Sequence, residues 1–90
     1  MHYENVLGTI GNTPLIRLNR VTKPIQAQVF GKVETFNPGH SAKDRIALFM
    51  IEEAERSGKL QAGGTVIEAT SGNTGYSLAM VSALKGYQCV

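Results

Sequence analysis

A lysine inside a short polar segment is the first feature of this sequence that could support chemistry. The segment Asn37–Arg45 (NPGHSAKDR) joins turn-forming residues to an apolar run, which predicts that Lys43 lies in the first turn of a helix. Backbone N–H groups and the helix macrodipole disfavour a cation there. The position suits a lysine that must be neutral to attack an aldehyde, if the apolar helix behind it buries the amine. The alternative is a solvated lysine that pairs with a carboxylate such as Asp44, and the residue types alone favour this alternative.

A second polar segment, Thr70–Gly75 (TSGNTG), lies between an expected strand and an expected helix. Open α/β sheets bind ligands at the carboxyl ends of parallel strands. Free backbone N–H groups and hydroxyls suit a carboxylate or phosphate there, and Asn73 offers both a donor and an acceptor. The alternative is that Gly72 and Gly75 only permit a tight turn, with Thr70 or Asn73 capping the helix. The spacing matches neither a dinucleotide-binding GxGxxG motif nor a Walker A loop.

The elements that must position these segments differ in the spacing of their apolar residues, which switches along the chain between a strand period and a helix period. Two runs with alternating apolar residues, Pro14–Asn19 and Gln26–Glu34, predict strands that pair with each other. The strand, helix and strand expected after these runs favour a parallel βαβ unit. The expected fold is therefore α/β with a leading β-hairpin. The later elements are expected as a helix from Ser41 to Gly58, a strand over Thr65–Ala69, a helix over Tyr76–Lys85 and a strand over Tyr87–Val90.

Several apolar side chains are expected in the core. The run Ile46–Ile51 is apolar on nearly every face of its helix, so more than one side of it should be covered. Tyr76 and the apolar positions after it should also be buried. Cys89, the only cysteine, is expected as a small buried residue.

Composition excludes several classes of function. Ninety residues make at most one small domain or a piece of a larger one, and a net charge of +2 without a basic stripe argues against nucleic-acid and membrane partners. One cysteine excludes an internal disulfide and a multi-cysteine metal site, and His40 has no ligand at metal spacing. No apolar run approaches a membrane span of about 20 residues, and the N-terminus has no secretory pattern, so a cytoplasmic location is expected.

Three motifs together resemble the cysteine synthase and cystathionine β-synthase family, the fold type II pyridoxal-phosphate (PLP) enzymes. They are Ile10–Leu18 (IGNTPLIRL), Glu34–Ala47 (ETFNPGHSAKDRIA) and Glu68–Gly75 (EATSGNTG), in the family's order and spacing. The chain departs from the family pattern at three positions. Ala42 stands where Val is usual, His40 where Gly or Asn is usual, and Ala69 where Pro is usual. None of these departures falls on a residue with an implied chemical role.

The resemblance implies roles for individual residues. Lys43 would hold PLP covalently and act as the base on the substrate's α-proton, and Asn73 would hydrogen-bond the cofactor's phenolic oxygen. The implied reaction is β-replacement on serine or O-acetylserine with sulfide or a thiol, giving cysteine or cystathionine. The alternatives are a PLP-dependent serine or threonine dehydratase and a non-catalytic α/β module. The residues implied in binding the substrate carboxylate are Thr70, Ser71, Gly72 and Thr74.

The resemblance also implies a division of the chain. Residues 12–34 would belong with the family's larger domain, and residues 35–90 would begin the smaller α/β domain. The family's glycine-rich phosphate loop would lie beyond position 90. The chain by itself is therefore expected to be a weakly stable N-terminal fragment with exposed apolar surface and little or no activity, from an enzyme expected to be a homodimer.

Overall fold

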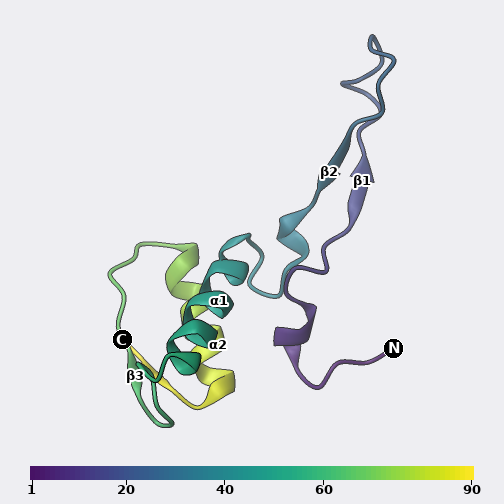
Figure 1. Ribbon diagram of the computed structural model, residues 1–90. Helices are drawn as coiled ribbons and strands as arrows, with labels where there is room; N and C mark the ends of the chain where they lie inside the picture. Colours follow the sequence, from purple (N-terminus) through teal and green to yellow (C-terminus); the bar gives the residue numbers. More distant parts are fainter.

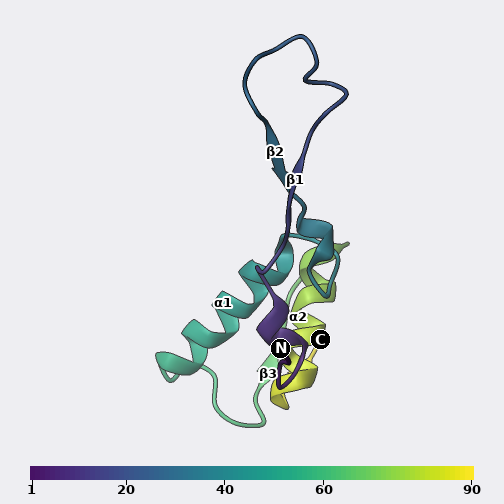
Figure 2. The same ribbon diagram turned by 90° about the vertical axis from the view of Figure 1, so that its right-hand side faces the viewer.

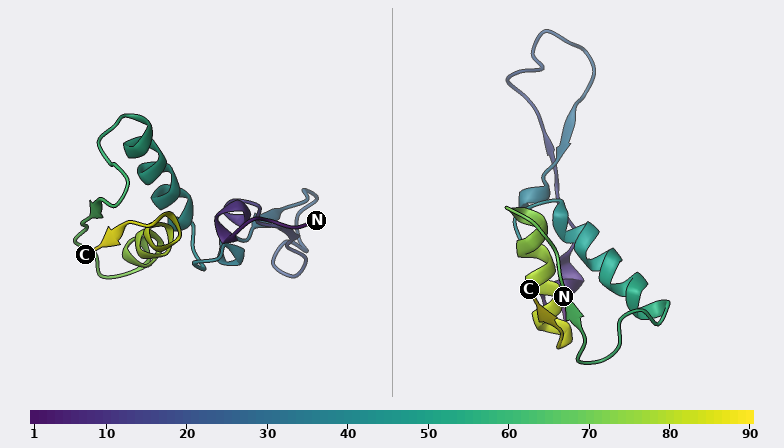
Figure 3. Two further views of the ribbon diagram at one scale, coloured as in Figure 1. Left: turned by 90° about the horizontal axis from the view of Figure 1, so that it is seen from below. Right: turned by 90° about the vertical axis from the view of Figure 1, so that its left-hand side faces the viewer.

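The chain forms two parts in a computed structural model that describes residues 1–90 (Figure 1). One part contains the N-terminal segment and a β-hairpin, and the other contains two packed helices and two short strands. Viewed from below, the two parts lie on opposite sides of the segment that joins them (Figure 3). The whole chain is elongated, with extents of 54 × 34 × 20 Å.

The first part consists of a 3₁₀ helix, η1 (Val6–Thr9), and the antiparallel strands β1 (Leu15–Arg17) and β2 (Phe30–Lys32), in which Ile16 lies opposite Gly31. The predicted pairing is confirmed, but both strands are shorter than the alternating patterns suggested. Nothing packs on either face of the hairpin, and an isolated two-stranded hairpin is marginal in water. The apolar alternation in these strands therefore finds no core within the chain.

A short 3₁₀ helix, η2 (Glu34–Phe36), and a turn at Pro38-Gly39 lead into α1 (Lys43–Arg56). His40 in this turn adopts a left-handed φ of 65°, a conformation that favours Gly or Asn. Helix α1 begins two residues after the predicted start at Ser41. Its end agrees with the sequence, because Gly58 has a left-handed φ of 79° and stops the helix.

The second part contains a parallel strand–helix–strand unit. Strand β3 (Thr65–Val66) pairs in parallel with β4 (Gln88–Cys89), and α2 (Asn73–Lys85) connects them. Gly86 closes α2 with a left-handed φ of 82°. The predicted α/β fold with a parallel βαβ unit and a leading hairpin is confirmed, although α2 begins at Asn73 rather than at Tyr76.

The hydrophobic core lies between α1 and α2. Ala47 and Ile51 share one face of α1 because they are four positions apart, and they pack against Leu78 and Val81 of α2. Leu7 of η1 and Val66 of β3 cover part of this cluster. With only four fully buried apolar side chains, the core is small for the length of the chain.

Other faces of both helices carry apolar side chains that nothing in the chain covers. On α1, Phe49 is 70% exposed and Ile46 is 45% exposed, so the prediction that this run is covered on several sides is wrong for this chain. On α2, Tyr76 is 58% exposed instead of buried. Cys89 is also exposed instead of buried. The expected exposed apolar surface is therefore present, since α1 has one helical neighbour and the sheets have two strands each.

No helix combines the length and the apolar character needed to cross a lipid bilayer.

Candidate active site

The two segments predicted to carry chemistry begin neighbouring helices. Helix α1 begins at Lys43, and α2 begins at Asn73, within Thr70–Gly75. Both first turns lie at the same end of the helix pair (Figure 2). The Ser77 hydroxyl in α2 donates a hydrogen bond of 2.6 Å to Asp44 Oδ1 in α1. The fold therefore places the predicted lysine and the predicted polar loop at one end of the second part.

Lys43 is exposed, and its amine makes no hydrogen bond or ion pair within the chain. The expected burial of this amine is absent from the chain itself. Successive residues of an α-helix point about 100° apart, and the fully buried Asp44 takes the inward direction, so Lys43 points outward. The alternative pairing of Lys43 with Asp44 is absent too, because Ser77 and the Gly39 N–H occupy the carboxylate. The amine is thus free to meet a ligand.

Hydrogen bonds from the backbone hold the Thr70–Gly75 loop in shape. Thr70 Oγ1 accepts from the Gly72 N–H at 3.2 Å and from the Gly75 N–H at 3.3 Å. The N-cap position of α2 is Gly72, which offers no side-chain cap, but Thr70 still satisfies the Gly75 N–H in the first turn of the helix. The polar side chains that follow make no hydrogen bond within the chain, which leaves them available to a ligand; they are Ser71, Asn73 and Thr74.

The two glycines of this loop differ in their surroundings. A Cβ at Gly75 would lie 2.2 Å from Thr70 Cγ2, so the packing of the loop itself requires glycine there. A Cβ at Gly72 would meet no atom within 4 Å. Internal packing therefore explains Gly75 but not Gly72, whose exposed backbone leaves room for a ligand to approach.

A polar network that the sequence did not reveal joins the hairpin part to α1. The Glu34 carboxylate accepts two hydrogen bonds from the Arg45 guanidinium, Nε to Oε2 at 2.8 Å and Nη2 to Oε1 at 2.9 Å. Thr13 and Asn37 donate to the same carboxylate at 2.9 and 2.7 Å. Arg45 also donates to the Gly11 carbonyl at 2.9 Å. Apart from Asn37, these partners are too far from Glu34 in sequence for a local pattern to signal them, although they hold the start of α1 in place.

The network shifts the titration of its acidic member. The hydrogen bonds from Arg45 lower the pKa of Glu34 from 4.5 to about 2, partial burial opposes this shift, and the hydrogen bonds from Asn37 and Thr13 add to it. The same interaction raises the pKa of Arg45 above its ordinary value. The pair therefore stays ionised over the whole physiological range.

We expect the contribution of Glu34 to stability to be complete above pH 4.5. It should be lost as the pH falls from 4.5 toward about 2, because the folded chain binds this proton less readily than the unfolded chain does. Following the Glu34 carboxyl carbon by NMR during an acid titration should give a midpoint near 2, and Arg45→Gln should move it toward 4.5. Glu34→Gln confirms the assignment of the signal. A midpoint near 4.5 in the unaltered chain would contradict the network.

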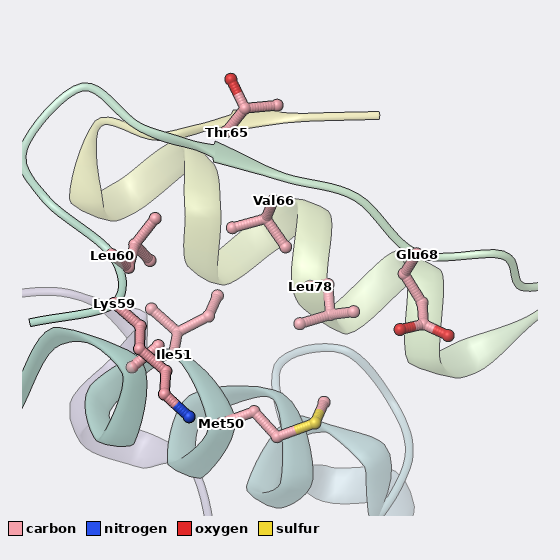
Figure 4. Close-up of a pocket in the computed structure, with 9 residues that line it drawn as sticks. Met50, Ile51, Lys59, Leu60, Thr65, Val66, Glu68 and Leu78 are labelled. Carbon is pink, nitrogen blue, oxygen red and sulfur yellow. The ribbon is translucent and has the colours of Figure 1, made fainter. Parts of the chain in front are cut away.

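A hollow of about 250 Å³ lies between α1, α2 and β3, apart from the predicted site (Figure 4). Apolar side chains such as Ile51, Val66 and Leu78 line it, and Lys59 and Glu68 lie at opposite edges. Neither Lys43 nor any residue of the Thr70–Gly75 loop contributes to its lining. The hollow extends the small core and is not part of the candidate site.

The free groups at the helix starts fit part of a PLP site. A primary amine can bind the cofactor's aldehyde carbon, and Lys43 presents one without an internal partner. An amide can hydrogen-bond an oxygen of a planar ring, and Asn73 presents one. The Ser71 and Thr74 hydroxyls are donors suited to a carboxylate. No cluster of three or more His, Cys, Asp or Glu side chains suits a metal ion.

Comparisons with known proteins show the family of the chain. A family model described as pyridoxal-phosphate dependent enzyme matches residues 6–90. The chain is 52% identical over 88 residues to cystathionine beta-synthase from Rattus norvegicus, covering 96% of this chain and 16% of that protein. It is 53% identical over 87 residues to cysteine synthase from Staphylococcus aureus, covering 97% and 28%. The crystal structure of an O-ureido-L-serine synthase superposes with a TM-score of 0.91 at 47% identity, covering 99% of this chain and 28% of that chain. The chain thus spans less than a third of the length of each.

Proposed function

Because this chain belongs to the family of pyridoxal-phosphate-dependent enzymes, we propose that it supplies the lysine and the substrate loop for a β-replacement reaction. The substrate is serine or O-acetylserine, and the incoming group is sulfide or a thiol. The products are cysteine or cystathionine, which would place the reaction in cysteine biosynthesis or transsulfuration. The supporting observation is the free Lys43 amine at the same end of the fold as the free polar groups of Thr70–Gly75.

PLP, when bound, supplies the electron sink for the reaction. Lys43 would hold the cofactor through its amine and would then move the proton of the substrate's α-carbon. Asn73 would donate a hydrogen bond to the phenolic oxygen of the ring. The loop residues Thr70, Ser71, Gly72 and Thr74 orient the substrate by binding its carboxylate, so that the α-proton faces Lys43.

The division into domains is part of the same proposal. Residues 12–34 would pack with a larger domain, and residues 35–90 would begin a smaller one. The separation of the hairpin from the helix pair supports this division (Figure 3). We further propose, by analogy with the family, a homodimer in the cytoplasm.

An assay with two substrate pairs tests the function. It uses the parent polypeptide, meaning the longest natural chain that contains these 90 residues, with Met1–Val90 alone as a second sample. O-acetylserine with sulfide should give cysteine, or serine with homocysteine should give cystathionine. The 90-residue chain alone should show little or no activity, since it spans 28% or less of the relatives described above.

The assay also separates the alternative activity. A dehydratase would release a 2-oxo acid from serine or threonine with no thiol present. That result, together with no β-replacement product from either pair, would contradict the proposed reaction while leaving the cofactor assignment intact.

A further inference from the structure

Asp44 is a buried acid that the proposed chemistry does not use. Its side chain is 0% exposed although it adjoins the exposed Lys43. The carboxylate accepts two hydrogen bonds of 2.6 Å, from the Gly39 N–H to Oδ2 and from the Ser77 hydroxyl to Oδ1. The N-terminal end of α1 also favours a negative charge at this position. Burial of this carboxylate is therefore compensated by specific donors.

These contacts differ from the helix cap that the sequence suggests. Asp44, three residues after Ser41, is spaced for a capping box, yet it bonds the N–H of Gly39 instead. The turn lies so close that a Cβ at Gly39 would be 2.1 Å from Asp44 Oδ1. The left-handed His40 reverses the chain there. One carboxylate thereby joins the turn before α1 to α2.

The bond from Ser77 is the only polar side-chain link between the helices at this end. The other link, from Lys85 to Glu55, lies at the opposite end. The apolar core between the helices has little directional preference, so it tolerates small rotations and shifts of α1. A hydrogen bond constrains both distance and angle.

We propose that Asp44 is a positioning residue that fixes Lys43 relative to the Thr70–Gly75 loop through Ser77. This proposal rests on the proposed function, because the alignment of Lys43 with the Thr70–Gly75 loop matters only if both take part in that reaction. Without the link, the starts of α1 and α2 could shift relative to each other, and the amine would move relative to Asn73 and to the loop that receives the substrate.

Two buried serines of α2 provide a matched test in the parent polypeptide. Ser77 and Ser82 are both 0% exposed, but the Ser82 hydroxyl has no hydrogen-bond partner. Ser77→Ala should increase amide hydrogen exchange in residues 70–75 roughly 3- to 10-fold. It should also lower borohydride-trapped PLP on Lys43 at limiting PLP, while Ser82→Ala should change neither. Equal behaviour of the two variants would overturn the proposal.

Variants of Asp44 test whether geometry is what matters. In Asp44→Asn the side-chain oxygen can still accept from Gly39 and the amide can donate to the Ser77 hydroxyl, whereas Asp44→Ala loses both bonds. The asparagine variant should therefore retain most of the PLP trapped on Lys43 in the wild type, and the alanine variant should lose it. An asparagine variant as defective as alanine would contradict the positioning role.

The two readouts keep this proposal separate from the proposed function. If the wild-type protein traps no PLP on Lys43, the proposed function fails, but hydrogen exchange still reports whether Ser77 orders the loop. If PLP is trapped equally in the Ser77→Ala and Ser82→Ala variants, the cofactor assignment stands and the positioning role is wrong.

Discussion

Replacing Lys43 with alanine is expected to abolish covalent capture of PLP and to lower the rate of β-replacement by at least about 10²–10⁴-fold. The reason is that the proposed function gives one amine two tasks, holding the cofactor and moving the substrate's α-proton. Absorbance of the bound cofactor and initial rates in the parent polypeptide measure the two effects separately. The bound-cofactor absorbance and the β-replacement activity should be lost together.

Two controls separate this chemistry from a general effect of charge. Lys43→Arg keeps the positive charge, but a guanidinium is not deprotonated in proteins, so this variant should be as inactive as alanine. Lys59 is another exposed lysine, at the edge of the hollow beside α1, and Lys59→Ala should bind PLP normally. A Lys43→Ala protein that still captures PLP would show that another group holds the cofactor.

Gly75→Ala is expected to give the second largest loss of function, through weaker binding of the amino-acid substrate. Helix propensity alone favours alanine by about 1 kcal/mol. However, the new Cβ would lie 2.2 Å from Thr70 Cγ2, so the Thr70 side chain must rotate away. That rotation breaks the hydrogen bonds from Gly72 and Gly75 to Thr70 Oγ1, which together contribute about 1–3 kcal/mol. We expect amide exchange across the loop to increase and the KM for the amino-acid substrate to rise on the order of tenfold.

Thr70→Ser supplies the compensating change. Serine keeps the hydroxyl and both hydrogen bonds but lacks the methyl group that would clash; the other contacts of the new Cβ, with Cβ and the hydroxyl oxygen of residue 70, would be 3.4 and 3.5 Å. The double variant Gly75→Ala/Thr70→Ser should therefore recover most of the exchange protection and of the substrate affinity, and Thr70→Ser alone should resemble the wild type. If the double variant is no better than Gly75→Ala, the clash with Thr70 is not the cause of the loss.

Local signals in the sequence predicted the order of elements well. Gly58 was predicted to end one helix, and Gly86 directly follows the other predicted helix; both have left-handed backbone conformations that glycine adopts at low cost. The parallel pairing of β3 and β4 followed from strand, helix and strand spacing, and the comparison structures share the fold. The lengths of the hairpin strands were overestimated, and no other element packs on the hairpin to support longer pairing.

The candidate site was less predictable in its details. The motifs identified Lys43 and the Thr70–Gly75 loop, but nothing local indicated that Asp44 would bond Ser77 in another helix. Because that bond turns Asp44 inward, the amine of Lys43 points outward, opposite to the expected burial. The pairing of Glu34 with Arg45 was missed for the same reason. Such contacts depend on how helices pack, which a pattern of residue types does not contain.

The exposed apolar side chains are consistent with the chain covering only a small share of each relative's length. Phe49 and Tyr76 lie on helix faces that patterns assigned to the core. The patterns indicated correctly that these faces are apolar, since the run Ile46–Ile51 is apolar on nearly every face of its helix. They could not indicate how much of the covering structure lies within the 90 residues.

The most direct test of the central claim is a map of the lysines that react with PLP in the parent polypeptide. After incubation with PLP, borohydride reduction and proteolysis, mass spectrometry locates each pyridoxyl group. We predict that Lys43 carries nearly all of it within these residues. The other lysines, which should stay at background, are Lys23, Lys32, Lys59 and Lys85. A label spread over the exposed lysines, or absent from Lys43, would contradict the assignment of this residue as the cofactor's anchor.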